Sequence, residues 1–328
     1  MNNAKTRFKF LQKIDLQRVV IISVLIVLFA FFSIASPSFR KYTTIITLFG
    51  YMYYILLMAI GVTFPLITGG VDLSIGTGLV CYSIVGSYLI NHQNMPIWAG
   101  ILVTLILGTV MGAFNGLIVS VLQLPPFITT LCTMMIARGL GSILAGGLTG
   151  VWPAATAEGG WVRNVLKTTL PNGTILPIGM LWMLIIIAVM TLILTKTRIG
   201  RYTIAIGSNR EALRLSGVRV VKWHVIAYMI SGFFAGLAAL AYGWTFTTIT
   251  PGTGAGFELD AIGAAIIGGT SMTGGKGSII GTFLGVLLIS LLKTGLPYIG
   301  LQANWQQIIT GIVLILAVTI DMIRSKKR

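Results

Sequence analysis

Apolar residues along the chain form long runs that are separated by short polar or glycine-rich stretches. A helix needs about 20 apolar residues to cross the hydrocarbon core of a bilayer. Runs near this length predict helices at 18–36, 44–68, 72–90, 96–122, 126–147, 175–195, 224–246, 257–270, 278–295 and 304–322. The pattern therefore predicts an all-α fold: a single domain over residues 1–328, built as a polytopic transmembrane helical bundle of about ten spans, some of them broken helices.

Composition supports this class. Hydrophobic residues make up 55% of the chain and charged residues only 9%, whereas soluble domains contain about 25% charged residues. The mean hydropathy is +0.93. These values exclude a soluble globular protein.

The net charge of +16 arises mainly from three clusters of basic residues between apolar runs. The clusters are Lys5, Arg7, Lys9, Lys13 and Arg18 at the start, seven residues from Lys196 to Lys222, and Arg324, Lys326, Lys327 and Arg328 at the end. Loops rich in Lys and Arg stay in the cytoplasm, and an even number of spans puts both termini on that side. We therefore expect cytoplasmic N- and C-termini, a cytoplasmic loop at 196–223, a periplasmic loop at 148–174 and no nucleic-acid partner.

The stretch "LITGGVDLSIGTG" interrupts the second and third apolar runs. Proline lacks an amide donor and glycines weaken helices, and an ionised aspartate at the bilayer centre costs about 3 kcal/mol. The chain is therefore expected to break here and to line the protein interior or a pathway. The residues involved are Pro65, Gly69, Gly70, Asp72, Ser74 and Gly76. Asp72 and Ser74 suit the capping of a new helix, while contact of Asp72 with a solute or another subunit stays open.

A second interruption, "GFELDAIGAAIIGGTSMTGGKGSIIGTFLGV", lies in the C-terminal half. Its candidate pathway residues are Glu258, Asp260, Gly268 and Gly269. The glycines around Lys276 resemble a phosphate-binding loop, but Thr270 and Gly277 stand where that motif needs glycine and a hydroxyl residue. A tight cytoplasmic turn between helices is expected instead of an ATP site.

The sequence contains few residues of the types that form catalytic sites. The chain has seven acidic residues and two histidines, and their spacing matches no zinc motif and no catalytic set. We expect no enzyme activity, no metal and no cofactor. Because a pump driven by protons or sodium carries acids along several spans, the driving force is expected to come from a partner.

The loop "GRYTIAIGSNREALRLSGVRVVKWH" predicts a short amphipathic helix on the cytoplasmic side. Asn209 or Ser208 can cap its start, and Gly217 suits its end. Such a helix either lies on anionic lipid or docks a soluble partner.

Three stretches carry a family resemblance: "GGVDLSIG", "NREALRLSGV" and "GFELDAIGAAIIGGTSMTGGKGSIIGT". They resemble the permease subunits of bacterial ABC sugar importers of the ribose, arabinose and xylose group, with ribose permeases most similar. The resemblance implies a permease domain in the bacterial inner membrane, a sugar substrate and a second permease copy or paralogue. It also implies a cytoplasmic ATP-binding subunit, which uses the ATP, and a periplasmic solute-binding protein.

The resemblance further implies that the segment 209–218 is the coupling helix that enters the ATPase. Glu211, Ala212 and Gly217 are similar to the importer pattern E-A-A-x-x-x-G, with Leu213 in place of the second alanine. The implied coupling residues are Asn209, Arg210, Glu211, Ala212, Leu213, Arg214, Leu215 and Gly217. The broken helices around Asp72 and Gly268 would then shift the opening of the pathway.

Other solutes remain open, because permeases for branched-chain amino acids or for a furanose signalling molecule share the D-L-S-x-G stretch. A stand-alone secondary transporter or channel is a further alternative. Uptake by the chain alone, without ATP or an ATPase, would favour it.

Overall fold

The computed structural model describes residues 16–246 and 248–326, and helices dominate this part of the chain. In chain order the helices are α2 (Leu16–Ala35), η1 (Pro37–Arg40), α3 (Tyr42–Ile67), α4 (Ile75–His92), α5 (Ile97–Val121), α6 (Pro126–Leu144), η2 (Gly160–Val165), α7 (Gly179–Lys196), α8 (Arg198–Ser208), α9 (Arg210–Leu215), α10 (Val220–Thr245), α11 (Phe257–Ile267), α12 (Ile279–Tyr298) and α13 (Ala303–Lys326). Strands β1 (Thr168–Thr169) and β2 (Ile175–Leu176) form an antiparallel hairpin, and β3 (Pro251–Gly254) precedes α11.

Every predicted apolar segment overlaps a helix in the described part of the chain. Seven helices there are long and apolar enough to cross a membrane, namely α2, α3, α5, α6, α7, α10 and α12. The α11 helix has only 11 residues, so it is too short to cross alone. The prediction of an all-α polytopic membrane protein is confirmed.

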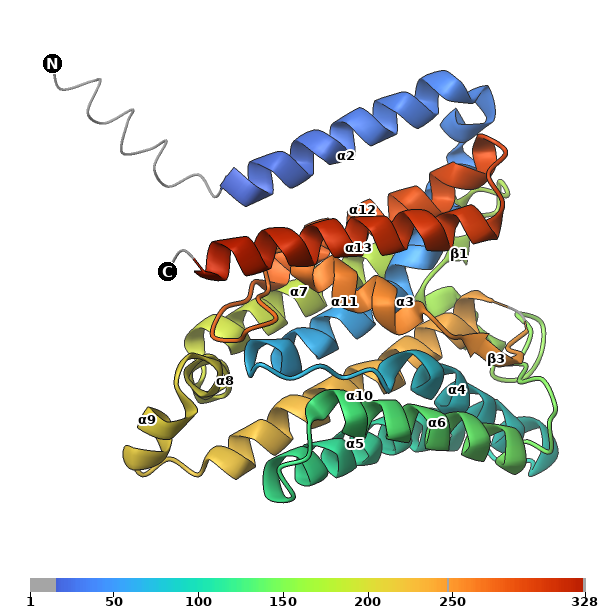
Figure 1. Cartoon of the computed structure of the whole chain (residues 1–328). Coiled ribbons are helices and arrows are strands. Elements are labelled where there is room, and N and C mark those ends of the chain that lie inside the picture. The colour runs from blue at the N-terminus through green and yellow to red at the C-terminus, as the bar shows by residue number, and fades with distance from the viewer. Residues whose placement is uncertain (1–15, 247, 327–328) are drawn as a thin grey trace, which may run out of the picture.

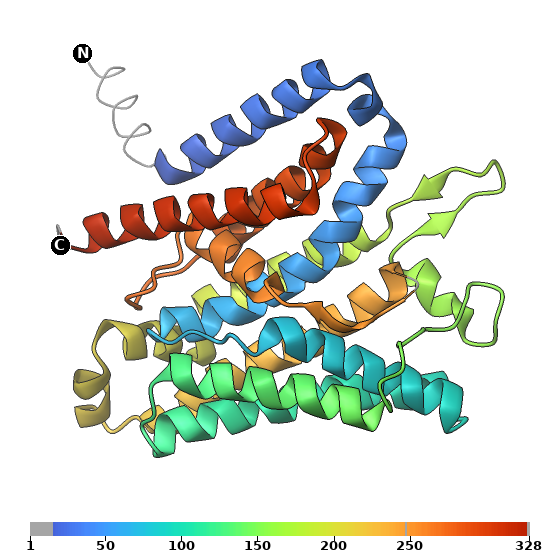
Figure 2. The ribbon, with the colours of Figure 1, turned by 45° about the vertical axis from the view of Figure 1, so that its right-hand side comes forward.

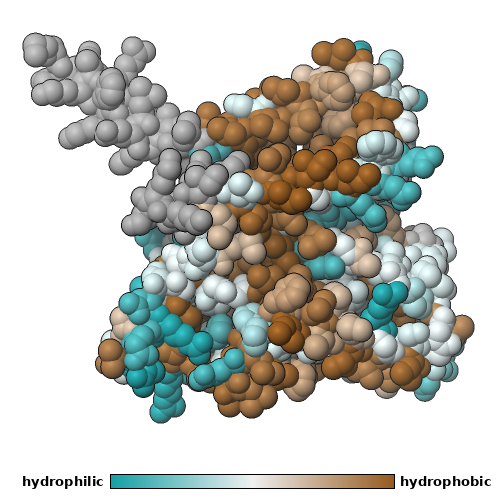
Figure 3. All heavy atoms as spheres, viewed as in Figure 1, coloured by the Kyte–Doolittle hydropathy of each residue, from teal (hydrophilic) through white to brown (hydrophobic). Residues whose placement is uncertain are grey.

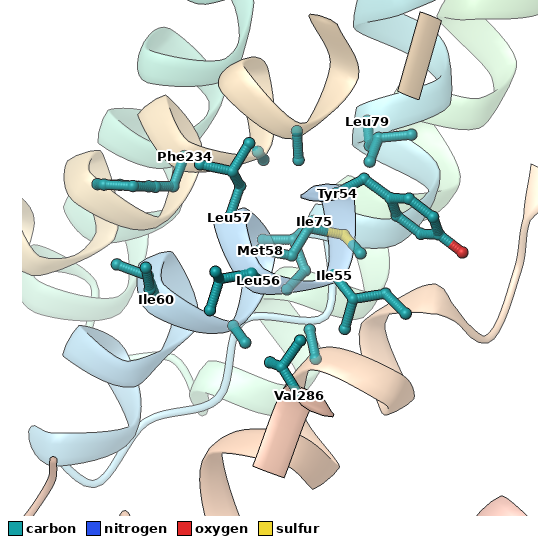
Figure 4. Close-up of a cluster of buried hydrophobic side chains, with 14 of the residues drawn as sticks. Tyr54, Ile55, Leu56, Leu57, Met58, Ile60, Ile75, Leu79, Phe234 and Val286 are labelled. Carbon is teal, nitrogen blue, oxygen red and sulfur yellow. The ribbon is translucent and has the colours of Figure 1, made fainter. Parts of the chain in front are cut away.

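The centre of the bundle is formed by α3 and α10. Both helices are largely buried, and α12 is buried to a similar extent, whereas α2 presents most of its side chains to the outside. Figure 4 shows Tyr54, Leu57 and Ile60 of α3 packed among side chains that include Phe234 of α10 and Val286 of α12. Apolar residues cover much of the face shown in Figure 3, as expected for a protein whose solvent is lipid.

The α5 and α10 helices approach one another through small residues. A methyl group on Gly112 or Gly232 would overlap the backbone of the facing helix. Glycines at four-residue spacing let transmembrane helices pack backbone to backbone. This contact brings α5 against the central helix α10 along much of its length.

The two described chain ends lie at one end of the bundle. Figures 1 and 2 show the start of α2, the end of α13, α8 and α9 together at that end, with η1, β1 and β3 at the opposite end. This arrangement is the one that an even number of spans requires. Several residues of the terminal basic clusters lie outside the described residues: Lys5, Arg7, Lys9, Lys13, Lys327 and Arg328.

Candidate functional site

The predicted break between the second and third apolar runs is present as an irregular stretch between Ile67 and Ile75. Pro65 lies inside the last turn of α3, two residues before its end. The carbonyl of Pro65 accepts hydrogen bonds from Thr68 Oγ1 at 2.7 Å and from Gly70 N at 3.0 Å. Gly69 adopts φ +84°, which favours glycine. The helix therefore ends with its last carbonyls satisfied, as a buried break requires.

Asp72 is the centre of a buried polar network in this stretch. Its side chain is 0% exposed, and Oδ1 accepts hydrogen bonds from Ser74 N at 3.0 Å and Ser74 Oγ at 2.6 Å. Ser231 of α10 donates its hydroxyl to Asp72 Oδ2 at 2.7 Å. Asn115 of α5 donates from Nδ2 to Ser74 Oγ at 2.9 Å. The network thus holds the start of α4 against both α5 and α10.

The capping prediction is wrong for Ser74, and Asp72 does not cap an amide inside α4. Asp72 binds the amide of Ser74, one residue before α4, rather than an amide inside the helix. Ser74 occupies the N-cap position without a side-chain capping bond; its hydroxyl donates to Asp72 and accepts from Asn115. Sequence reasoning missed Ser231 and Asn115, which no local signal links to Asp72.

The second interruption is the loop 268–278 between α11 and α12. Ser278 caps α12 by accepting a hydrogen bond from Gly281 N at 3.0 Å. Gly268 packs so closely on Gly281 that a methyl group there would overlap its backbone. Gly269, at φ +95°, continues the chain into the loop. The loop then folds back over the end of α3, where Gly275 N donates to the carbonyl of Ile67 at 2.8 Å.

The two interruptions meet a third segment, the end of α8. A methyl group on Gly207 would overlap both the carbonyl oxygen of Ile67 and the amide nitrogen of Gly275. Gly274 lies beside them, where an added β-carbon would be 3.0 Å from the Gly207 Cα and from Gly69 N. We call these residues, Ile67, Gly69, Gly207, Gly274 and Gly275, the glycine junction. It is a backbone-to-backbone contact that leaves no room for side chains.

The α9 helix follows the glycine junction directly. Asn209 ends α8 and caps α9, because its Oδ1 accepts the amide hydrogen of Ala212 at 2.9 Å. Gly217 closes the segment at φ +81°. Ser208 donates its hydroxyl back to Ile204 of α8 instead of capping. The expected short helix is therefore present, with Asn209 as its cap.

The surface of α9 is open to a partner. None of its residues is buried, and Leu215 is 76% exposed. Arg214 donates to both carboxylate oxygens of Glu211, at 2.6 and 3.0 Å, and this hydrogen bonding lowers the pKa of Glu211 and raises the pKa of Arg214. Figure 3 shows hydrophilic atoms gathered over this end of the molecule. The helix offers a charged, projecting surface with one uncovered leucine.

A cavity of about 1510 Å³ separates α9 from the bundle. The first interruption contributes Thr68, Gly69 and Gly70 to its wall, and Arg210 and Arg214 line the opposite side. Gly70 also packs on the Tyr228 hydroxyl of α10. The broken helix therefore borders an open space at the end of the bundle that carries α9.

Glu258 and Asp260 both lie in the first turn of α11 and are buried. Glu258 Oε1 accepts the amide of Gly256 at 3.1 Å, and its Oε2 lies against Gly76 in the first turn of α4. Asp260 Oδ2 forms an ion pair with Lys293 Nζ of α12 at 2.6 Å. Sequence reasoning missed Lys293, although a lone basic residue in an apolar run is a usable signal.

The candidate residues thus form one connected set rather than two separate sites. The starts of α4 and α11 touch through Gly76 and Glu258. At the glycine junction, the end of α3 and the loop between α11 and α12 meet the end of α8, directly before α9. In the described part of the chain, no three His, Cys, Asp or Glu side chains form a group that could hold a metal ion. The arrangement is suited to transmitting movement between segments.

Comparison with known proteins agrees with this architecture. The family described as "Branched-chain amino acid transport system / permease component" matches residues 44–318. The chain belongs to this permease family. Permease components of this family are transport subunits, and the chain is accordingly a multi-pass membrane permease.

Relatives of this permease cover nearly its whole length. The ribose import permease of Haemophilus influenzae is 34% identical over 307 residues, which are 93% of each chain. The ribose import permease of Escherichia coli K12 is 33% identical over 302 residues, 90% of this chain and 91% of that protein. The fructose import permease of Bifidobacterium longum is 32% identical over 273 residues, 82% and 79% of the two chains. No solved structure matches the permease.

Proposed function

We propose that this chain is the membrane subunit of an ATP-driven importer of a monosaccharide. The observation that carries the proposal is the glycine junction, which joins the exposed helix α9 to both interrupted helices of the bundle. A motor that moves α9 would therefore move the two interruptions. The relatives support the substrate class, because they are named as import permeases for ribose, galactose and fructose.

The proposal includes a membrane orientation. About ten spans, some of them broken helices, would run in the bacterial inner membrane as one permease domain. Both termini and the loop 196–223 would lie in the cytoplasm and the loop 148–174 in the periplasm. The common position of α8, α9 and both described chain ends supports this orientation (Figure 1). The basic residues between Lys196 and Lys222 agree with it.

The partners follow from this orientation. A cytoplasmic ATP-binding subunit would bind α9 and use the ATP, so the permease itself needs no cofactor. A periplasmic solute-binding protein would deliver the sugar to the opposite end, and a second permease copy or paralogue would complete the membrane part. The apolar exposed side chains of α2, α5 and α13 suit contact with lipid or with that second copy.

In this mechanism, the partner ATPase supplies the free-energy difference between two states of the permease. Movement of α9 would pull on Gly207, and Gly207 contacts both Ile67 and Gly275. The end of α3 and the loop between α11 and α12 would then shift together. The Asp72 network would keep the start of α4 attached to α5 and α10, so that the irregular stretch 68–74 absorbs the displacement.

Reconstituted transport tests the proposed function. The permease would be co-expressed with the ATPase and the solute-binding protein encoded beside it and placed in proteoliposomes. Uptake of labelled D-ribose, D-galactose, D-fructose and leucine would then be measured. We expect uptake of at least one sugar, dependent on ATP and on both partners. Leucine uptake without sugar uptake, or accumulation by the permease alone, would contradict the proposal.

Reversing the charge of Glu211 is expected to weaken the contact with the ATPase. Glu211→Lys removes the ion pair with Arg214 and places a positive charge on the exposed face of α9. A charge misplaced at an interface costs several kcal/mol, so we expect ATP-dependent uptake and sugar-stimulated ATP hydrolysis to fall together, by about tenfold or more. Both rates would be measured in proteoliposomes.

Glu158→Lys is the matched control for this variant, because Glu158 is also exposed but lies in the loop at the other end of the bundle. It should leave both rates within about twofold of the original protein. Equal losses in the two variants, or none in Glu211→Lys, would show that α9 does not dock the ATPase.

A further inference from the structure

A second cavity lies between α11, α12 and α13 and has a volume of about 360 Å³. Ligand pockets for small molecules measure about 300–1,000 Å³, so the cavity suits a small solute. Six of the side chains around it matter for its chemistry: Phe257, Asp260, Lys293, Gln306, Gln307 and Thr310. Five of these side chains are polar, although they belong to helices of a membrane bundle.

The cavity lies toward the end of the bundle opposite α9. Asp260 is in the first turn of α11, and Gln306 and Gln307 are near the start of α13. Figure 1 shows both helix starts on the side of η1 and β3, away from α8 and α9. In the proposed orientation, this is the periplasmic side, where a delivered solute arrives.

The charges in the cavity cancel. Lys293 and Asp260 form an ion pair at 2.6 Å, with side chains 16% and 5% exposed, and the Lys293 ammonium lies 5.5 Å from the centre of the Phe257 ring. A charged or zwitterionic solute would have to compete with this pair for its partner charges. The cavity therefore favours a neutral solute.

Hydrogen-bonding capacity in the cavity is left unused. Within residues 16–246 and 248–326, Lys293 donates one hydrogen bond, to Asp260, although its ammonium has three donors. Gln306 and Thr310 are half-buried and Gln307 is exposed, so their polar groups are open to water or to a polar solute. Polar groups that face a space between helices are stable when water or a polar solute satisfies their hydrogen bonds. These groups therefore need water or a polar solute beside them.

We propose that this cavity binds a neutral polyhydroxylated solute, a monosaccharide, on its way into the permease. Each sugar hydroxyl both donates and accepts, which matches two amides, a hydroxyl and an ion pair around one space. The Phe257 ring supplies an apolar face for the C–H groups of the sugar. This inference rests on the proposed function and specifies its substrate class, because a neutral cavity favours a sugar over an amino acid.

The α11 helix connects the site to the first interruption. Asp260 lies two residues after Glu258, whose carboxylate packs on Gly76 in the first turn of α4. Because side chains two residues apart point to different sides of a helix, the cavity and the start of α4 lie on different sides of α11. Movement of the interrupted helices would reach the bound sugar through α11.

Two conservative substitutions test the site in the complete transporter. Gln306→Leu and Thr310→Val keep the side-chain size and remove the hydrogen-bonding groups. With saturating solute-binding protein, we expect each variant to lower the number of sugar molecules moved per ATP by about tenfold, the effect of one lost hydrogen bond to a desolvated group. ATP hydrolysis itself should stay within about twofold of the original rate.

Gln302→Leu and Thr319→Val are the matched controls. Both residues are exposed, and neither lines the cavity. They should leave the ratio of sugar to ATP unchanged. Equal ratios of sugar moved to ATP hydrolysed in the cavity variants and the controls would contradict the proposed binding site. A changed oligomeric mass of the Gln306→Leu complex would assign the amides to a subunit interface and would also overturn it.

Protection from a thiol reagent provides a direct measurement of occupancy. The cysteines Cys81 and Cys132 are first replaced by alanine, and Gln307→Cys is added in that background. A methanethiosulfonate reagent should modify this cysteine, and D-ribose, D-galactose or D-fructose should slow the reaction at least about threefold, whereas leucine should not. An unreactive thiol, or a rate that no sugar changes, would contradict the site.

The two hypotheses fail in different ways. If the original complex moves none of the three sugars, the proposed function is wrong. If the original complex moves a sugar and the cavity variants match it, only the binding site is wrong.

Discussion

Gly207→Ala is expected to lower sugar uptake strongly while the partner ATPase keeps hydrolysing ATP. Alanine is favoured over glycine in a helix by about 1 kcal/mol, so the substitution should stabilise α8 taken alone. In the folded chain, however, the new methyl group would overlap the carbonyl of Ile67 and the amide of Gly275. Overpacking of this kind costs about 1–3 kcal/mol, and here it would separate α8 from both interruptions. We expect uptake to fall at least about tenfold.

The measurement compares uptake with ATP hydrolysis in the same proteoliposomes. Gly139→Ala is the matched control, because Gly139 is also a helical glycine but has no atom within 4 Å of an added β-carbon. The control should transport normally and be present at normal abundance. Normal uptake by Gly207→Ala would mean that the glycine junction does not transmit the motion of α9.

Asp72→Ala is expected to cause the second large effect, a loss of stability. The substitution leaves the amide of Ser74 and the hydroxyls of Ser74 and Ser231 without their shared acceptor. Hydrogen bonds to a buried charged or strongly polar group contribute about 1.5–3 kcal/mol each. We expect the free energy of unfolding to fall by about 2–4 kcal/mol, with lower abundance in the membrane. Thermal unfolding of the purified permease in detergent measures this change.

Two milder variants distinguish the contribution of the hydrogen bond from Ser231 from that of the Asp72 carboxylate as a whole. Ser231→Ala removes only the bond between α10 and Asp72, so its effect should be less than half that of Asp72→Ala. Asp72→Asn keeps one side-chain oxygen that can accept two hydrogen bonds. Its loss of unfolding free energy should lie between those of Ser231→Ala and Asp72→Ala. An Asp72→Ala protein that unfolds at the original temperature would remove the structural role and favour direct contact with the solute.

Local sequence patterns were sufficient to predict most of the helices of this fold. The lengths of the apolar runs predicted the helices, because transfer of a helix into lipid depends on its own side chains and on few others. The break after Pro65 and the short helix after Asn209 were also predictable, since proline, glycine and capping residues act within one or two helical turns. The chemistry of Asp72 followed from the cost of an acid at membrane depth.

Contacts between distant segments were not predictable in this way. Ser231 lies 159 residues from Asp72, and Lys293 lies 33 residues from Asp260, so no spacing within a helix or turn relates them. Gly207 carried no signal at all, because a glycine selected for a close approach looks the same in sequence as one in a flexible loop. Only the packed bundle distinguishes these cases.

The sequence by itself determined which segments enter the membrane, where two of them break and which short helix projects from the bundle, because these properties arise from the polarity and backbone preferences of neighbouring residues. The tertiary structure alone decided that the two breaks and the base of α9 meet at Ile67, Gly207 and Gly275. It also decided that Asp260 faces Lys293 across a cavity. Such meetings depend on how whole helices pack against one another, and packing is a property of the assembled chain.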